Sequence, residues 1–219
     1  MAAPEEDQHK DTATMAPSSQ PEPQPQPQPT TPLPPVPAPI LTLANCLIRA
    51  YHPSDAEKMA MAANSLDIAK NMRNTYPYPY TLENAHYWIN FANSASPVLN
   101  FGIYSPDQDN FLGGIGLRAG ADIECRTYEV GYWIAPAAWG RGLATEALKG
   151  FCRWAFETFG GVLRLEASVF ATNEASSRVL GKAGFMHEGT RRRAVWKSGE
   201  VLDIKIFGLL REECLGEAK

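Results

Sequence analysis

The sequence has little cysteine and no long apolar run. Its four cysteines lie far apart, at Cys46, Cys125, Cys152 and Cys214. They form no C-x-x-C pair and have no histidine at ligand spacing, so neither a zinc site nor a disulfide framework is indicated, and reduced thiols are expected. No apolar stretch approaches the length of a membrane-spanning helix. We therefore expect no metal and no membrane contact.

The N-terminus also lacks the features of a targeting segment. It has no apolar core of the kind that signal peptides carry, and it is acidic where transit peptides are rich in arginine. These absences favour the cytoplasm as the location, and they leave the nucleus open as an alternative.

Most of the chain has no excess charge of either sign. The first 40 residues contain Lys10 against five acidic residues. Residues 41–219 therefore hold 19 of the 20 basic and 19 of the 24 acidic residues, and their net charge is zero. A neutral domain offers no electrostatic basis for binding nucleic acid or an anionic membrane, so neither partner is predicted.

Proline is concentrated near the N-terminus. Eleven of the 18 prolines lie between Pro17 and Pro39, where they alternate largely with glutamine. Such a composition cannot bury enough apolar surface to offset the entropy lost on ordering. We predict a disordered tail over residues 1–40 with polyproline II character, and one folded domain over residues 41–219. Residues 33–37 (LPPVP) are either a docking motif for an SH3- or WW-like partner or a solvated spacer.

Hydrophobic periodicity and turn residues divide the domain into strands and helices. The expected strands are 41–51, 98–104, 111–118, 124–134, 162–169 and a closing hairpin over 185–210, and the expected helices are 55–64, 68–74, 81–93, 144–158 and 173–183. Three antiparallel strands precede a β-loop-α-β crossover. This order predicts an α/β (α+β) fold with a mixed, mostly antiparallel sheet of about six to seven strands and helices on both faces.

The loop that follows residues 129–136 (EVGYWIAP) points to a ligand. It reads WGRGLAT over residues 139–145 and leads from a strand into a helix. Glycine lets the backbone approach a diphosphate closely, and successive N–H groups with the helix dipole attract negative charge. The sequence has neither a G-x-G-x-x-G nor a G-K-S/T pattern, so NAD and ATP fit poorly. Spacing alone is equally compatible with an ordinary βα turn.

The same loop resembles a family signature. WGRGLA is similar to the R/Q-x-x-G-x-G/A motif of the GNAT acetyltransferase superfamily, which binds the pyrophosphate of acetyl-CoA. Trp139, followed by G-x-G-x-ATEAL, resembles the branch that includes the RimJ/RimL ribosomal-protein N-terminal acetyltransferases. Residues 173–185 (NEASSRVLGKAGF) and 68–89 (IAKNMRNTYPYPYTLENAHYWI) resemble the same branch. The resemblance covers about residues 41–212.

This resemblance implies an acetyl-CoA-dependent N-acetyltransferase that moves an acetyl group to a primary amine by direct attack in a ternary complex. Residues 129–135 and 162–169 would splay apart to admit the pantetheine arm, and a backbone N–H near Ile134 or Ala135 would stabilise the oxyanion. Asn173 would bond the pantetheine amide, or act only as a helix N-cap. The implied cofactor-binding residues are Ile134, Trp139, Gly140, Arg141, Gly142, Leu143, Ala144, Thr145 and Asn173.

The proton-transfer residues are less determined by the sequence. An amine acceptor with a pKa of about 10 must lose a proton. Glu129 is the first candidate for the base and Glu166 the second, although either can be a solvated strand residue. Many family members protonate the leaving thiolate with a tyrosine whose position is Leu180 here, and leucine cannot serve. Ser176 either takes that role or is an ordinary first-turn serine.

Several alternatives stay open. The acceptor is an amine-bearing small molecule or a protein N-terminus, and the protein is a monomer or a homodimer. A non-catalytic acyl-CoA sensor of the same fold is the rival function, because position 180 lacks the usual tyrosine. Residues 191–193 (RRR) are a phosphate site or solvated side chains. The tyrosines of residues 76–80 line an acceptor pocket or pack in the core, whereas Trp133 and Trp139 are expected to pack.

Overall fold

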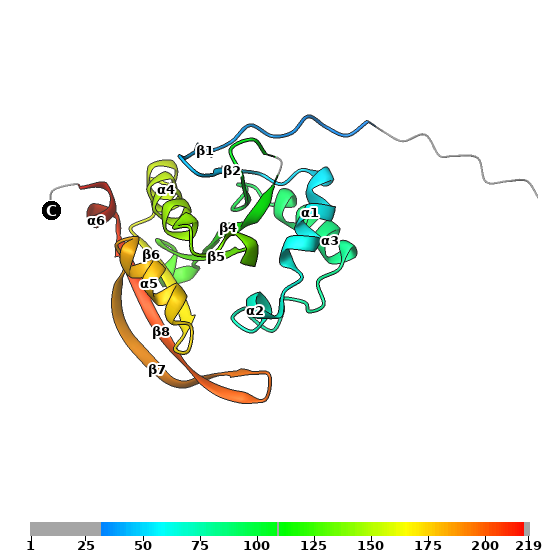
Figure 1. Ribbon diagram of the computed structural model, residues 1–219. Helices are drawn as coiled ribbons and strands as arrows, with labels where there is room; N and C mark the ends of the chain where they lie inside the picture. Colours follow the sequence, from blue (N-terminus) through cyan, green and yellow to red (C-terminus); the bar gives the residue numbers. More distant parts are fainter. Residues whose placement is uncertain (1–31, 109, 217–219) are drawn as a thin grey trace, which may run out of the picture. The chain divides into compact units, whose positions relative to one another are not determined.

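A single mixed sheet runs through the domain in the computed structural model, which describes residues 32–108 and 110–216 (Figure 1). Most of the predicted tail, residues 1–31, lies outside the described residues. In sheet order the strands are β1 (Leu41–Thr42), β2 (Leu47–Arg49), β3 (Asn100–Tyr104), β4 (Phe111–Ala119), β5 (Thr127–Ile134), β6 (Arg164–Phe170), β8 (Glu200–Leu210) and β7 (Met186–Lys197). Neighbouring strands are antiparallel except β5 and β6, which are parallel. The predicted mixed, mostly antiparallel sheet is confirmed.

The sheet has more strands than expected because the predicted strand 41–51 is broken. The chain reverses between β1 and β2, where the Leu43 N–H donates to the Cys46 carbonyl at 2.8 Å. Asn45 at this turn donates through its backbone N–H and its side-chain amide to Glu146, at 3.0 and 2.8 Å. Glu146 is 101 residues away in sequence, so the local pattern gave no sign of this contact.

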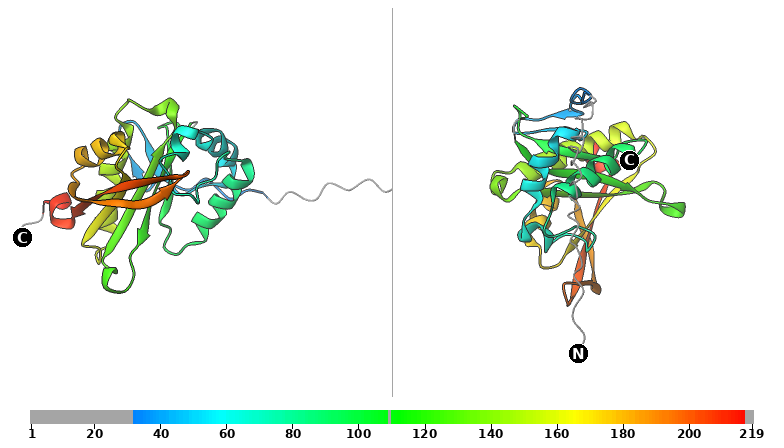
Figure 2. Two further views of the ribbon diagram at one scale, coloured as in Figure 1. Left: turned by 90° about the horizontal axis from the view of Figure 1, so that it is seen from below. Right: turned by 90° about the vertical axis from the view of Figure 1, so that its right-hand side faces the viewer.

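Helices cover both faces of the sheet (Figure 2). They are α1 (Ala56–Ala63), α2 (Leu66–Ala69), α3 (Leu82–Ser94), α4 (Leu143–Thr158), α5 (Glu174–Lys182) and α6 (Arg211–Leu215). Because side chains alternate along a strand, Phe101 and Ile103 of β3 pack in the core beneath α4, while Tyr104 packs with α1 and α3 on the other face. In the described part of the chain, no helix is long and apolar enough to cross a membrane.

Local signals placed the helix starts well and the helix lengths less well. Thr81 Oγ1 accepts the Asn84 N–H at 3.2 Å, and Asn173 Oδ1 accepts the Ser176 N–H at 3.1 Å, so both predicted N-caps are confirmed. The helix expected over 68–74 is wrong in extent, since α2 ends at Ala69 and a turn follows. The strand expected from residue 124 begins at Thr127, after a short 3₁₀ turn. Helix α6 was not predicted.

A buried ion pair holds the connection between β2 and α1. Two nitrogens of the Arg49 guanidinium each donate to an Asp55 oxygen at 2.9 Å, and Tyr104 donates to the same carboxylate at 2.7 Å. Burial alone would raise the pKa of Asp55, but these hydrogen bonds and one from the His52 N–H outweigh it and hold the pKa below its ordinary value.

The residues just before β1 contact the domain. His52 is buried, and its Nδ1 accepts the Ser54 N–H at 3.2 Å, so Nε2 carries the proton and donates to the Pro34 carbonyl at 2.7 Å. The Ile40 N–H donates to the Ile48 carbonyl at 2.9 Å. Residues 32–40 form no helix or strand, yet these bonds fix two points of the segment.

Candidate active site

The two parallel strands at the centre of the sheet separate partway along their length. Strands β5 and β6 pair only from Thr127 with Arg164 to Glu129 with Glu166. Both strands continue beyond this point, and β6 goes on pairing with β8 as far as Phe170. The backbone groups of β5 that face β6 after residue 129 therefore have no strand to bond. This is the separation that the family resemblance implied between 129–135 and 162–169.

One N–H beyond this separation faces the space between the strands. The Ala135 N–H donates to the Leu112 carbonyl of the β4 segment at 2.8 Å, so it is already used. Adjacent residues in a strand point their backbone groups to opposite edges. The N–H of Ile134 therefore points away from β4 and toward β6. Of the two predicted donors, the geometry favours Ile134.

The loop after β5 is fastened to the end of that strand. Trp139 Nε1 donates to the Ile134 carbonyl at 2.7 Å, while about half of the Trp139 side chain stays exposed. Trp139 was expected to pack and, from the family resemblance, to belong to the cofactor-binding loop; the hydrogen bond adds a role that the sequence did not indicate. The indole thus fixes the loop relative to the strands.

Helix α4 begins without a side-chain cap. Its N-cap residue, Gly142, is left-handed at φ 76°, and Gly140 is left-handed at φ 75°. A Cβ built on either glycine would meet no atom of the described residues within 4 Å, so both glycines border open space. The first N–H groups of a helix have no intrahelical partner. These uncapped donors suit a phosphate group.

The remaining loop residues divide into backbone and side-chain contributors. Leu143 is buried in the core beneath α4, so only its backbone can serve a ligand. Arg141 is exposed, and Ala144 and Thr145 are half-buried at the start of the helix. The predicted phosphate-binding residues are thus brought together on one turn of chain. Gly140, Gly142 and Ala144, which have no side chain or only a methyl group, fit the close approach that a diphosphate needs.

Glu129 lies where three elements meet, on the sheet face opposite α4. Arg73, in the segment after α2, donates to its Oε1 at 2.6 Å, and Arg118 of β4 donates through Nε to its Oε2 at 2.8 Å. The Glu129 side chain is 15% exposed, whereas both arginines are mostly exposed. The two guanidinium groups neutralise the carboxylate and fix its orientation.

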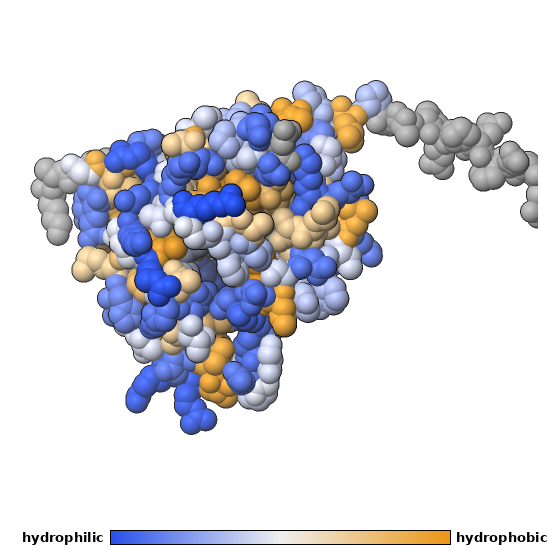
Figure 3. All heavy atoms as spheres, viewed as in Figure 1, coloured by the Kyte–Doolittle hydropathy of each residue, from blue (hydrophilic) through white to orange (hydrophobic). Residues whose placement is uncertain are grey.

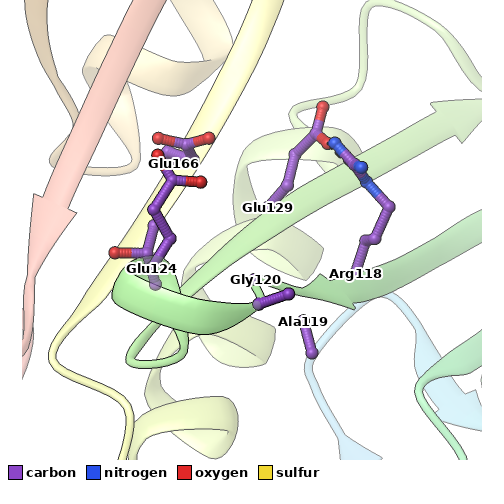
Figure 4. Close-up of a pocket in the computed structure, with 8 residues that line it drawn as sticks. Arg118, Ala119, Gly120, Glu124, Glu129 and Glu166 are labelled. Carbon is purple, nitrogen blue, oxygen red and sulfur yellow. Dashed lines mark hydrogen bonds and ion pairs between the residues drawn. The ribbon is translucent and has the colours of Figure 1, made fainter.

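A pocket of about 270 Å³ adjoins Glu129 (Figure 4). Its lining residues are Arg118, Ala119, Gly120, Ala121, Glu124, Thr127, Glu129 and Glu166. Figure 4 shows Arg118 and Glu129 directed toward each other, with Glu124 and Glu166 on the other side of the pocket. Both predicted candidates for the base therefore line one pocket, because Glu129 and Glu166 are paired in the parallel register.

Ser176 has a partner that the sequence did not reveal. The hydroxyl of Tyr132 lies 2.9 Å from Ser176 Oγ. Tyr132 shares the inward face of β5 with Val130 and Ile134, and burial raises its pKa to about 12 even though the Ser176 hydrogen bond lowers it. Leu180 is fully buried. The alternation in EVGYWIAP could have signalled a tyrosine hydroxyl that needs a polar partner.

Two further sequence features contribute packing and backbone structure. Tyr76 and Tyr80 contact each other, Tyr76 also contacts Trp133, and the Tyr76 hydroxyl donates to the Ala63 carbonyl at 2.9 Å. Packing is therefore their observed role. In β7 the pairing register shifts between Arg191 and Val195. Among residues 32–216, with position 109 left aside, no group of histidine, cysteine or acidic side chains could hold a metal.

A family model described as an acetyltransferase (GNAT) domain matches residues 45–186. That is more than half of the chain, so this chain belongs to the GNAT acetyltransferase family. The predicted family is confirmed.

Individual relatives agree with this assignment. The uncharacterized N-acetyltransferase p20 of Bacillus licheniformis is 27% identical over 173 residues, which are 77% of this chain and 94% of p20. The uncharacterized N-acetyltransferase YoaA of Bacillus subtilis (strain 168) is 34% identical over 113 residues, 52% of this chain and 63% of YoaA. The match thus spans less than two thirds of YoaA.

The fold also matches solved structures. Mycobacterium smegmatis RimJ, in complex with CoA-disulfide, has a TM-score of 0.67 at 24% identity, and the match covers 79% of this chain and 85% of that chain. At this identity the likeness concerns the fold. A RimJ protein is thus among the structural neighbours, as the branch resemblance predicted.

Proposed function

We propose that this protein is an acetyl-CoA-dependent N-acetyltransferase that acts on a primary amine in the cytoplasm. The observation that carries the proposal is the separation of β5 from β6 beside the uncapped N-terminus of α4. An extended arm and a diphosphate would both find backbone donors there. Family membership and the bound CoA of the RimJ structure support this choice of cofactor.

The cofactor would be held chiefly by backbone groups. The N–H groups at the start of α4 and the two left-handed glycines would bind the pyrophosphate, with Arg141 and Thr145 beside them. Bound acetyl-CoA supplies an acetyl group activated as a thioester. The Ile134 N–H would donate to the thioester carbonyl oxygen as negative charge develops on it. Asn173 caps α5 through Oδ1, and its amide nitrogen would serve the pantetheine arm.

A carboxylate of the pocket beside Glu129 would remove the proton from the acceptor amine. Glu129 is our proposed base, acting directly or through water, because its carboxylate is held in one orientation at the end of the paired part of β5. Glu166, which lines the same pocket, is the second choice. Ser176 would hydrogen-bond the departing sulfur. Bringing amine and thioester together would supply much of the rate enhancement.

The acceptor is proposed only by class, as an amine-bearing small molecule or a protein N-terminus. We also propose that residues 41–219 act as the catalytic domain, as a monomer or a homodimer, and that residues 1–40 take no part in the chemistry. The described pocket mixes three carboxylates with Arg118, and this balance does not single out a polyamine.

One screen tests the proposal. Acetyl-CoA consumption is measured in parallel with peptides that have free N-termini, with polyamines and with amino sugars. Consumption that depends on one of these classes is expected, with the acetyl group found on its amine by mass spectrometry. No turnover with any class, together with tight acetyl-CoA binding, would contradict the enzymatic function.

A further inference from the structure

One hydrogen bond joins the two sides of the central separation. Tyr132 is on β5, beyond the last residue that pairs with β6, and Ser176 is on α5, which follows β6 in the chain. Their hydroxyl oxygens are 2.9 Å apart. The space-filling view shows the surface hollowed between β5 and α5 (Figure 3). This polar contact therefore lies where a ligand between the strands would pass.

The pair is also close to the proposed oxyanion donor. Tyr132 precedes Ile134 by two residues, which is roughly 7 Å along an extended strand. Both side chains point to the same face of β5, and both N–H groups point toward β6. If the thioester carbonyl oxygen of acetyl-CoA were bonded to the Ile134 N–H, the thioester sulfur would lie near the hydroxyl groups of Tyr132 and Ser176.

Either hydroxyl of this pair can be the donor, and the arrangement that would serve a ligand is the one in which Tyr132 donates. Tyr132 is half-buried against α4 and α5, and burial keeps its phenol neutral over the working pH range. A neutral phenol beside a serine hydroxyl can donate to the serine oxygen. The serine then keeps its own hydrogen for a second partner. The backbone of Ser176 is fixed by the N-cap of α5, because its N–H donates to Asn173 Oδ1 at 3.1 Å.

We propose that Tyr132 is a positioning residue for Ser176, whose O–H it directs toward the sulfur leaving group. The inference rests on the proposed acetyl transfer. In that reaction the amine nitrogen forms a bond to the acetyl carbon, and the carbon–sulfur bond breaks with its electron pair on sulfur. The directed O–H stabilises this thiolate, while the amine proton leaves through the base and solvent returns a proton to sulfur.

The test uses the full-length protein and removes one oxygen atom. Tyr132→Phe is expected to lower kcat about fivefold, the rate equivalent of a typical hydrogen bond, and to leave the calorimetric Kd and the KM of acetyl-CoA within about twofold. Ser176→Ala is expected to give a similar or larger loss of kcat. The double variant is expected to be no slower than Ser176→Ala, because both changes remove one linked interaction.

Tyr128→Phe is the matched control. Tyr128 is on the same face of the same strand and packs against Phe159, and its hydroxyl has no hydrogen bond to any described residue. Its variant is expected to keep the wild-type kcat, and a melting curve for each variant checks the fold.

Three results would overturn the inference while acetyl transfer by the wild type stands. They are an unchanged kcat in Tyr132→Phe, additive losses in the double variant, and a loss of acetyl-CoA affinity equal to the loss of kcat. If Tyr132→Phe fails to fold, Ser176→Ala decides alone, because it must lower kcat without weakening acetyl-CoA binding. A wild type that transfers no acetyl group would overturn the proposed function itself, and the inference with it.

Discussion

The loop over residues 139–142 and the pocket beside Glu129 flank the same separated strands, yet they are built in opposite ways. The loop offers backbone donors, empty space above two glycines and one exposed arginine. The pocket offers charged side chains from β4, β5, β6 and the 3₁₀ turn before β5, and the Glu129 carboxylate in it is bonded to Arg73 and Arg118. The first region depends on the absence of side chains, and the second depends on which side chains meet.

This difference predicts how each region responds to change. A backbone site tolerates few side chains where glycine stands, because bulk or negative charge occupies the place of the phosphate. A side-chain site tolerates changes of shape but not the loss of a titrating group. The cofactor end should therefore respond in binding affinity, and the acceptor end in turnover.

The largest effect is expected from Gly142→Glu. A carboxylate at the N-cap of α4 would fill the empty space and repel the pyrophosphate, so acetyl-CoA binding measured by calorimetry should be lost. Gly199→Glu is the matched control, because Gly199 in the β7–β8 turn is also left-handed, at φ 87°, and equally open. Unchanged affinity in folded Gly142→Glu protein would refute the assignment of the loop.

The next effect is expected at the acceptor end. Glu129→Gln should lower kcat about 100-fold without weakening acetyl-CoA binding. A base works only as the anion, so the wild-type rate should fall as pH decreases, and the glutamine variant should lose that acidic limb. Glu166→Gln is the control from the same pocket and should keep both the rate and the limb. Reversed results would transfer the role of base to Glu166.

A smaller effect is expected from Trp139→Phe, which removes the Nε1 donor and keeps an aromatic ring. The loss of one hydrogen bond, about 1 kcal/mol, should weaken acetyl-CoA binding about fivefold. Trp196→Phe serves as the control, since Trp196 is 64% exposed on β7 and its ring N–H has no partner among the described residues. If both changes altered the acetyl-CoA affinity equally, Trp139 would have no specific role in the site.

The smallest effects are expected from deleting the N-terminal segment, which tests whether the loop and the pocket depend on it. Deletion of residues 1–31 should leave the Tm and the acetyl-CoA affinity unchanged. Deletion of residues 1–40 also removes the Pro34 and Ile40 hydrogen bonds, and should lower the Tm by about 2–5 °C while affinity stays the same. A loss of affinity in either protein would show that the segment serves the site.

Local chemistry made part of this structure predictable. The caps at Thr81 and Asn173 and the alternation along the strands depend on neighbours in sequence, so much of the fold could be predicted from them. The glycines of the loop fit an ordinary turn equally well, and only the family resemblance indicated a cofactor there. The bonds of Glu129 to Arg73 and of Tyr132 to Ser176 join residues 56 and 44 positions apart. No sequence period reports such pairs, so Glu129, Glu166 and Ser176 could be named as candidates from the sequence, whereas their partners and the shared pocket emerged only from the structure.

Both backbone groups of Ile134 face the same edge of β5, and they have different partners. Its carbonyl is held by the indole of Trp139, and its N–H is our proposed oxyanion donor. The proposed diphosphate-binding loop and the proposed reaction centre therefore share a single residue of backbone. If a bound diphosphate displaced the loop, the displacement would reach Ile134 through the Trp139 hydrogen bond and change the orientation of the Ile134 N–H. Binding of the diphosphate would then alter how well this N–H is placed to bond the thioester carbonyl.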